Sequence, residues 1–516
     1  MLRILVPTVA LVAGFGLAQP ASAQTGVDLV VQAVAAQGGA AALNAAKTTT
    51  IKGEAKHWEP GQSFSPTGEA RFLGDATYTQ TVDNAARTSR VDWDRDMKYP
   101  AVEKLKYSEI TTPTFGVAVD DKNAQTAMSG SRLAALLRER ERASPRLLAR
   151  ALQNPNSISP LPDQSAGNQL YPAVSIKGAY GTFIVLFDRA NNLPVVVRNR
   201  EIDNVYGDSN YDLVLSDWKA VGNTKRAHTL SYQLNGMEVQ RLTLKEVTTD
   251  APIPANTFAV ADDIKAKAKA PAADAPYQWM LRRTFLGRLT DSDKIYFPEN
   301  GSFKLVELAP NVQHVVGGSA NNLIVAMKDG LVIFDAPVDE GQSRWVIDAA
   351  KAKYPGKPIK ALVMTHHHMD HSGGARAYVA EGAEVVLPGQ ARPFFEKMFA
   401  AKHELKPDAL AKSPKTAKIV DVKDTLSLKD DTVAIDLINL PNPHVDGMVI
   451  GHVHGPNLNV VWVTDLVSPR GPIGRSPATV AVGDALRKAN ITDATIAGGH
   501  GTTAKQADIA AALAAN

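Results

Sequence analysis

The chain contains no cysteine among its 516 residues. Disulfide bonds are therefore excluded, and so is lipid attachment to a cysteine at a signal-peptide cleavage site. The remaining composition is ordinary for a soluble globular protein, with 44% hydrophobic and 21% charged residues. The fold must therefore be stabilised by a buried apolar core without covalent cross-links.

A strong excess of one charge is also missing. The chain has 56 Lys and Arg against 53 Asp and Glu, a formal net charge of +3. We find no dense block of Lys and Arg with interleaved aromatic residues, so the sequence argues against a nucleic-acid partner. Beyond the N-terminus, no apolar run approaches the length of a membrane span, so no transmembrane helix is predicted.

The first residues have the pattern of a secretory signal. Arg3 supplies a positive charge, residues 4–17 are mostly apolar, and Ala21-Ser22-Ala23 forms a cleavage site before Gln24. The apolar run is short for a spanning helix, which disfavours an uncleaved anchor. We predict a signal peptide over residues 1–23 and export of the protein, with the bacterial periplasm as its compartment.

The length of the chain indicates at least two further domains. Residues 27–47 are rich in Ala and predict a helix broken at Gly38-Gly39. From Thr48 the apolar period changes to two, which indicates strands. Residues 133–152 predict another helix. The predicted strands are 70–82, 88–93, 106–119, 173–176, 182–187, 193–198, 211–216, 228–234 and 237–248.

So many strands with few helices predict an antiparallel sheet domain over residues 24–262. Its last two strands form a hairpin around Asn235-Gly236, a strong turn signal. Residues 263–276 are rich in Ala, Lys and Pro and have no apolar period, so residues 263–302 are interpreted as a linker and connecting segment.

Three segments of this first domain resemble periplasmic lipoprotein carriers, whose curved antiparallel sheet wraps an apolar cavity. The segments are residues 188–197, Tyr206-Gly207-Asp208 and residues 253–258. The resemblance implies that the domain carries a lipophilic ligand. A scaffold that supports or shields a catalytic domain is an equally good interpretation.

The remaining residues, 303–516, alternate strand-like and helix-like segments. Asp329-Gly330 joins two apolar runs in a predicted hairpin, and a helix is predicted over residues 344–353. Residues 359–364 are short, mostly apolar and preceded by Pro355-Gly356, so they predict a buried strand. The periodicity therefore predicts layers of helices and sheets.

Directly after this strand stands a His-x-His-x-Asp-His motif, filled by His366, His368, Asp370 and His371. Residues two apart in an extended loop point the same way, so His366 and His368 can bind one metal ion. The two residues that follow can bind a second ion nearby, because zinc accepts both imidazole nitrogen and carboxylate oxygen. Gly373-Gly374 allows a tight turn after the motif.

Three more residues with suitable side chains follow strand-like runs further along the chain: His444, Asp465 and His500. Asp465 ends an apolar run that begins at Val460. Strand ends that each deliver one ligand are a more specific signal than the motif alone, because the ends of neighbouring strands meet at one edge of a sheet.

Together these residues resemble the metallo-β-lactamase superfamily over residues 303–516. The resemblance implies an αβ/βα sandwich and a dinuclear metal site. It implies a first metal site of His366, His368 and His444. It implies a second site of Asp370, His371 and His500, with Asp465 bridging the two ions and Asp335 supporting a ligand from behind.

The resemblance further implies two zinc ions, with iron or manganese as alternatives, and a metal-bound hydroxide that attacks a carbonyl. Asp370 would be the catalytic residue, since it would bind the second ion and orient the nucleophile. The expected substrate is a small molecule with an ester, lactone, amide or β-lactam bond. The sequence identifies neither that substrate, nor the residues that bind it, nor the oligomeric state.

Some features depart from particular members of the superfamily. Certain β-lactamases have Cys where this chain has Asp465, and a Cys-free chain excludes that subclass. Asp at this position resembles glyoxalase II, lactonases and related esterases. However, Asn442-Pro443-His444-Val445 lacks the Gly-His-Thr pattern of glyoxalase II, which disfavours a glutathione thioester substrate.

Two other functions stay open at this point. One is a mononuclear-iron dioxygenase of the same superfamily that acts on persulfides, although such members use fewer of the seven ligands. The other is a lipophilic-ligand-binding protein with a structural metal domain. His452 and His454, which alternate on one strand face, are interpreted as surface residues or as residues that support the metal ligands, and Arg470 as a solvated loop residue.

Overall fold

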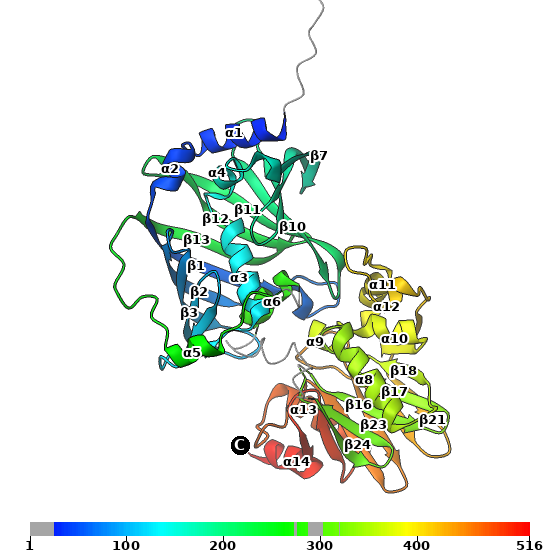
Figure 1. Ribbon diagram of the computed structural model, residues 1–516. Helices are drawn as coiled ribbons and strands as arrows, with labels where there is room; N and C mark the ends of the chain where they lie inside the picture. The colour runs from blue at the N-terminus through cyan, green and yellow to red at the C-terminus, as the bar shows by residue number, and fades with distance from the viewer. Residues whose placement is uncertain (1–24, 273–275, 287–302, 319, 516) are drawn as a thin grey trace, which may run out of the picture.

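The structure is a computed structural model that describes residues 25–272, 276–286, 303–318 and 320–515 (Figure 1). The predicted signal peptide therefore lies outside the described residues and stays a prediction. Part of the predicted connecting segment, residues 287–302, lies outside them as well.

The first domain is built on one large antiparallel sheet. Within the described residues, thirteen strands form it in the order β6-β5-β4-β3-β2-β1-β13-β12-β11-β10-β9-β8-β7. The strands are β1 (Thr48–Glu59), β2 (Arg71–Asp83), β3 (Thr88–Met97), β4 (Glu103–Thr111), β5 (Gly116–Val119), β6 (Gln125–Ala127), β7 (Ile158–Ala166), β8 (Gln169–Lys177), β9 (Thr182–Phe187), β10 (Pro194–Asp203), β11 (Gly207–Val221), β12 (Thr224–Leu234) and β13 (Met237–Thr249).

The sequence pattern explains this sheet. In β1 the side chains alternate between buried and more exposed positions, as expected for a strand with one face on a core. Asn235 and Gly236 join β12 to β13, both with positive φ, which is the backbone conformation that favours Asn and Gly in tight hairpins. The antiparallel sheet predicted for this domain is confirmed.

Helices of the first domain are short and interrupted: α1 (Gly26–Ala36), α2 (Ala40–Ala45), α3 (Gly130–Arg142), α4 (Leu147–Ala151), α5 (Asp262–Lys267), α6 (Tyr277–Leu286), η1 (Pro60–Gln62) and η2 (Pro155–Ser157). The helix predicted over residues 133–152 is two helices, because Pro145 lies at the break and cannot continue a helix. The strand predicted over residues 106–119 is likewise two strands, β4 and β5, with Pro113 in the turn between them.

One face of the large sheet is covered by these helices (Figure 1). Val30 of α1 and Leu148 of α4 belong to a buried cluster that includes Ile51, Tyr78 and Leu213 from the strands. Burial of these apolar side chains stabilises the curved sheet against the helices.

The second domain contains two sheets. Within the described residues, seven strands form the first sheet and six form the second, each in sequence order. The first holds β14 (Lys304–Ala309), β15 (Val312–Val316), β16 (Asn322–Met327), β17 (Gly330–Phe334), β18 (Ile359–Val363), β19 (Glu384–Pro388) and β20 (Lys418–Val422). The second holds β21 (Thr425–Lys429), β22 (Ala434–Asn439), β23 (Val449–Gly455), β24 (Leu458–Thr464), β25 (Thr495–Gly498) and β26 (Thr503–Lys505).

Helices lie outside both sheets: α8 (Glu340–Lys353), α9 (Met369–Ser372), α10 (Ala375–Glu381), η4 (Gly389–Ala391), α11 (Arg392–Ala400), α12 (Ala409–Lys412), α13 (Pro477–Lys488) and α14 (Gln506–Ala514). One buried cluster joins the two sheets, for example Phe334 with Trp462. A second packs α8 and α10 on the first sheet, and a third packs α13 and α14 on the other. The predicted αβ/βα sandwich is confirmed.

The two domains share a buried interface. Trp279 and Met280 of α6 belong to the same apolar cluster as Met369 at the start of α9. Among the described residues, no helix is both long and apolar enough to span a membrane.

Candidate metal centre

The His-rich motif lies where the sequence places it, on the loop after β18. This strand is buried and pairs in parallel with β17 and β19. The loop runs into α9 and then through Gly373 and Gly374. A Cβ atom on Gly373 would lie 1.9 Å from the carbonyl oxygen of Val338, and one on Gly374 would lie 2.0 Å from Ser343 Oγ. Neither position can therefore hold a side chain without moving the backbone.

The structure brings all seven predicted ligand residues to one edge of the sandwich, in two groups whose ligand atoms lie within 4.8 Å of one another. The first group is His366, His368, His444 and Asp465. The second group is Asp370, His371, Asp465 and His500. His444 follows β22, Asp465 follows β24 and His500 follows β25, so three strand ends of the second sheet face the loop from the first.

Asp465 stands between the two groups and offers one oxygen to each. Its Oδ2 lies 3.3 Å from His444 Nε2 and 3.9 Å from His366 Nε2. Its Oδ1 lies 2.8 Å from His371 Nε2 and 3.3 Å from His500 Nε2. Two ligands of one zinc ion lie at most about 4.2–4.4 Å apart, because each bond is about 2.0–2.2 Å long. These distances fit one ion on each side of a bridging carboxylate.

Several polar atoms at this edge are buried and have no hydrogen-bond partner among the described residues. They include the Nε2 atoms of His366 and His444 and Nδ1 of His368. Unpaired buried polar atoms cost free energy, and they converge here on the same space. The residues present therefore fit a pair of bound cations.

Asp335 supports this arrangement from behind. Its Oδ2 accepts a hydrogen bond from His371 Nδ1 at 3.0 Å, and its Oδ1 accepts from the backbone N–H and the hydroxyl of Thr365 at 2.9 and 2.8 Å. With Nδ1 held by Asp335, Nε2 of His371 faces Asp465 and is the ring nitrogen that a bound metal ion would take.

Thr365 links Asp335 to His366 and orients that imidazole ring in the same way. The Thr365 hydroxyl donates its proton to Asp335, so it accepts from His366 Nδ1 at 3.0 Å. The lone pair of His366 is then on Nε2, which points toward Asp465 Oδ2. One carboxylate thereby fixes the tautomers of ligands from both groups.

His368 is oriented by the first domain. Its Nε2 lies 3.0 Å from the carbonyl oxygen of Ser63, which follows η1. A carbonyl only accepts hydrogen bonds, so Nε2 carries the proton and Nδ1 keeps the lone pair. That Nδ1 is buried and has no protein partner among the described residues, as expected for a metal ligand. The neighbouring His367 also contacts Ser63, through Nε2 and the Ser63 hydroxyl at 3.1 Å.

The first domain reaches the second group as well. Gln62 Nε2 donates to Asp370 Oδ1 at 2.5 Å, and Tyr99 donates from its hydroxyl to Gln62 Oε1 at 2.7 Å. Arg71 donates to the carbonyl oxygens of Gln62 and His444 at 2.7 and 3.0 Å. Sequence reasoning missed these residues, because single polar residues about 300 positions from the motif give no local signal.

Burial and neighbouring charge set the protonation of the centre. Burial and the crowding of other imidazoles hold the pKa values of His366 and His368 well below the usual range, so both rings are neutral. Burial opposes a charge on His371 too, but the carboxylates of Asp465 and Asp335 outweigh it and raise its pKa. Burial raises the pKa of the Tyr99 phenol, and Asp370 and Asp465 raise it further, so Tyr99 remains a hydrogen-bond donor.

Other candidates from the sequence lie outside the two groups. His452 and His454 stack with ring centroids 4.4 Å apart, and His454 Nε2 lies 2.8 Å from Asp436 Oδ2 in a separate cluster on the second sheet. His314 is buried with its Nε2 against the carbonyl oxygen of Gly498 at 3.1 Å. Arg470 is exposed.

The comparison with protein families decides the identity of the second domain. Residues 315–506 match the family model described as the metallo-beta-lactamase superfamily. This domain belongs to the metallo-β-lactamase superfamily. The match covers the motif loop and the three other strand ends that deliver ligands to the centre.

The curated relatives match only a short segment of the chain. A linear primary-alkylsulfatase of Pseudomonas sp. is 35% identical over 78 residues, which is 15% of this chain and 12% of the relative. An (R)-specific secondary-alkylsulfatase of Pseudomonas sp. is 37% identical over 78 residues, with the same two shares. The match thus spans about an eighth of the length of these relatives.

The similar solved structures are more distant in sequence. The stereoselective inverting sec-alkylsulfatase Pisa1 from Pseudomonas sp. is 18% identical, with a TM-score of 0.31 and 45% of each chain covered. A B3 metallo-β-lactamase with an active-site glutamic acid is 17% identical, with a TM-score of 0.30, covering 41% of this chain and 88% of that one.

Proposed function

We propose that the protein is an exported, metal-dependent hydrolase that cleaves an ester, lactone or amide bond of a small molecule. The observation that carries this proposal is the placement of Asp465, whose two oxygens face two separate groups of ligands. The centre would hold two zinc ions, with iron or manganese as alternatives. Bound there, the metals would supply an activated water and positive charge for a developing oxyanion.

The residues of the chain prepare this chemistry. Asp335 and Ser63 orient the ligand histidines, so that each offers a lone pair to the centre. Asp370 is held by Gln62 through Oδ1, which leaves Oδ2 to face His500 at 3.7 Å. We assign Asp370 the role of binding the second ion and orienting the nucleophile.

A second candidate function is the hydrolysis of a sulfate ester. The observation that favours it is the 35–37% identity to two alkylsulfatases, over 78 residues in each case. Sulfate and carboxylate esters both develop negative charge on oxygen in the transition state, so a cationic centre serves either reaction. A mononuclear-iron dioxygenase is less well supported, because both ligand groups are complete here.

The test is a substrate panel with the full chain loaded with zinc. A chromogenic carboxylate ester, a lactone, a β-lactam and decyl sulfate would be compared, with released inorganic sulfate measured for the last. We expect turnover of at least one compound that disappears after chelation and returns when zinc is added. Turnover that survives both chelation and Asp370→Ala would contradict a metal-dependent hydrolase.

A further inference from the structure

The first domain contains a cavity of about 660 Å³ that is separate from the metal centre. It lies between the large sheet and helices α2, α3 and α4, and all its lining residues fall between positions 42 and 250. Its volume falls in the range of small-molecule sites, about 300–1,000 Å³. Neither the family match nor the proposed hydrolase assigns it a role.

One wall of the cavity is apolar. The strands contribute buried aliphatic and aromatic side chains to it: Ile51, Tyr78, Leu230, Tyr232 and Leu244. These residues come from four strands, β1, β2, β12 and β13, so the wall is a continuous patch of the sheet. Such a surface releases water when a hydrocarbon chain lies against it.

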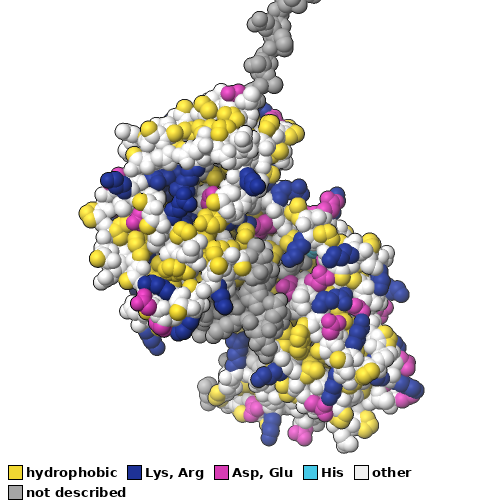
Figure 2. Space-filling model, viewed as in Figure 1, with side chains coloured by type: hydrophobic (Ala, Val, Ile, Leu, Met, Phe, Trp, Pro, Cys, Tyr) yellow, Lys and Arg dark blue, Asp and Glu magenta, His cyan; other side chains and the backbone are white. Residues whose placement is uncertain are grey.

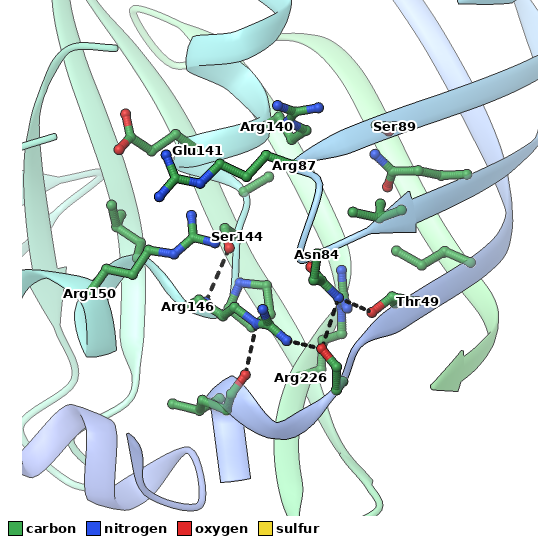
Figure 3. A pocket seen from close by; sticks show the side chains of 18 of the residues that line it. Thr49, Asn84, Arg87, Ser89, Arg140, Glu141, Ser144, Arg146, Arg150 and Arg226 are labelled. Carbon is green, nitrogen blue, oxygen red and sulfur yellow. Dashed lines mark hydrogen bonds between the residues drawn. The ribbon is translucent and has the colours of Figure 1, made fainter. Parts of the chain in front are cut away.

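Other parts of the lining are cationic, contributed by helices α3 and α4, the turn between β2 and β3, and strands β8 and β12. Figure 2 shows Lys and Arg side chains gathered in a hollow in the upper, N-terminal part of the molecule, next to hydrophobic ones. The cationic residues that line the cavity are Arg87, Arg140, Arg146, Arg150, Arg226 and Lys177. Figure 3 shows five of these arginines around the same space.

Among the described residues, none of the carboxylates in the lining forms an ion pair with these arginines. Glu139 accepts hydrogen bonds from Arg138 and Arg142, which are outside the lining. Glu109 pairs likewise with Arg132 at 2.6 Å. The other two acidic residues are used by the backbone: Glu141 accepts from the N–H groups of Ala179 and Tyr180 at 2.8 Å, and Asp250 accepts from that of Lys47 at 2.6 Å.

Two of the arginines are fixed by the protein. Arg146 donates to the carbonyl oxygens of Leu43 and Ala46, and Arg140 donates to Thr111. The other three, Arg87, Arg150 and Arg226, have no side-chain hydrogen bond or ion pair to any described residue. They are therefore available to a ligand.

Their electrostatic environment is unfavourable in the absence of an anion. Burial lowers the pKa of Arg226 to about 10, with no carboxylate to offset it and only the Tyr78 phenol raising it. Burial also lowers the pKa of Arg150, and the neighbouring Arg87 lowers it further, while Glu141 raises it. An anionic group placed among these guanidinium groups would relieve both effects, since Arg binds carboxylate and phosphate oxygens in a bidentate manner.

We infer that this cavity binds a single-chain amphiphile with an anionic head. The head lies among Arg87, Arg150 and Arg226, and the hydrocarbon tail lies on the wall formed by Ile51, Tyr78 and Leu244. A free inorganic anion would leave the apolar wall in contact with water. A neutral lipid would leave these three arginines without a partner. The apolar and cationic parts of the lining together therefore favour a ligand that has both a hydrocarbon tail and an anionic head.

Isothermal titration calorimetry of the zinc-loaded full chain tests this proposal. The probes are decanoate below its critical micelle concentration, 1-decanol with the same tail and no charge, and inorganic sulfate with charge and no tail. We expect decanoate to bind at least tenfold more tightly than either of the other probes. Octanoate should bind more weakly than decanoate, because two fewer methylene groups leave water.

Variants then locate the binding site. Arg87 and Arg150 are exposed at the rim, so Arg87→Gln with Arg150→Gln should leave the thermal unfolding midpoint unchanged and weaken decanoate binding at least tenfold. Arg226→Gln tests the half-buried position independently. Arg189→Gln is the matched control, since this exposed arginine of the same domain pairs with Asp163 outside the cavity.

Four results would overturn the proposal. Equal affinity for decanoate and 1-decanol would mean that the arginines do not bind the anionic head group. Equal affinity for decanoate and sulfate would mean that the wall does not hold the tail. If decanoate does not bind, or if all the cavity variants still bind it, the cavity is not a binding site for an anionic amphiphile. Hydrolysis at the metal centre is a separate readout, which the rim variants should leave unchanged.

Discussion

At the scale of single residues, Asp335 joins the two ligand groups. It contacts His371 directly and reaches His366 through Thr365. Asp335→Asn keeps the shape of the side chain but removes its charge, so it offers only one acceptor oxygen to the three donors. Metal affinity should fall about 10–100-fold, as for other partners of metal ligands. Competition with a chromogenic chelator measures the metal affinity of the parent and the variant.

The control for that variant is Asp436→Asn. Asp436 contacts a histidine at a similar distance, 2.8 Å, but in the separate cluster on the second sheet. It should leave metal affinity within about twofold of the parent, because it does not contact the centre. Equal losses in both variants would mean that Asp335 has no specific role in orienting the ligands.

Gly373 shows how tightly the loop is packed. A methyl group there would lie 1.9 Å from the carbonyl oxygen of Val338, so Gly373→Ala must displace the loop that carries His368 and Asp370. We expect about 1–3 kcal/mol of destabilisation, as for other overpacked sites, together with loss of metal. Urea denaturation with and without zinc measures both. Gly236→Ala is not a suitable control because of its positive φ, whereas Gly474→Ala is, since a Cβ there meets nothing within 4 Å.

Asp339 provides a prediction about pH. Burial raises its pKa to about 6, although its Oδ1 accepts a hydrogen bond from the Gln342 N–H at the start of α8. The folded state then binds the proton more tightly than the unfolded state, whose Asp pKa is about 3.9. The contribution of Asp339 to the free energy of unfolding therefore falls as pH rises from about 4 to about 6 and is constant above that range.

Asp339→Asn keeps an acceptor at the helix start and removes the titration. The variant should be more stable than the parent at pH 7.5, and the difference should shrink at pH 4.5. Denaturation of the chelated protein at both values checks this without interference from metal loss. A difference that grows toward acidic pH would show that the carboxylate, rather than its protonated form, is favoured in the folded state.

At the scale of elements, a buried charge network fixes α6 to the strands β1 and β10 of the large sheet. Arg282 donates to Glu59, which precedes η1, and to Asp203 at 2.8 Å. Burial disfavours charge on Arg282, but the two carboxylates outweigh it and raise its pKa. Removal of one partner leaves the other charges buried, so Arg282→Ala should cost about 3–5 kcal/mol of unfolding free energy.

Arg344→Ala is the comparison for that variant. Arg344 pairs with Glu381 at 2.6 Å, but both side chains are partly exposed, and such pairs contribute about 0–1 kcal/mol. Chemical denaturation of the two variants should therefore differ by several kcal/mol. Equal effects would mean that the network around Arg282 does not stabilise the packing of α6 on the large sheet.

The elements also show which parts of the structure are predictable from sequence. The motif residues His366 to His371 are close in sequence, and buried strands are recognised by composition, so the motif loop and its strand could be placed in advance. The αβ/βα order of the sandwich required the family resemblance. The break between α3 and α4 was missed, because the apolar period continues across Pro145.

The contacts between domains could not be predicted. Ser63 and Gln62 reach the centre only because β1 ends beside it in the folded protein. The arginines of the cavity are likewise spread from Arg87 to Arg226 on separate elements. No periodicity or local spacing links residues that meet only through the curvature of a large sheet.

At the scale of the whole molecule, the first domain contributes hydrogen bonds to the candidate metal centre of the second. Ser63 orients His368, and Gln62 holds Asp370. Gln62→Ala removes the hydrogen bond to Asp370 Oδ1 without touching a ligand histidine. We expect turnover to fall about tenfold or more, as for a misplaced catalytic group, while metal content stays close to the parent value. Full activity in this variant would mean that the domain contact is structural only.

The central claim is that one edge of the sandwich binds two metal ions bridged by Asp465. The most direct measurement is the elemental metal content of the purified full chain, after zinc has been offered and excess removed, for the parent and for Asp465→Asn. We predict close to two ions per chain in the parent and a clear loss in the variant. A parent chain that binds no metal, or that binds two ions regardless of Asp465, would contradict the account.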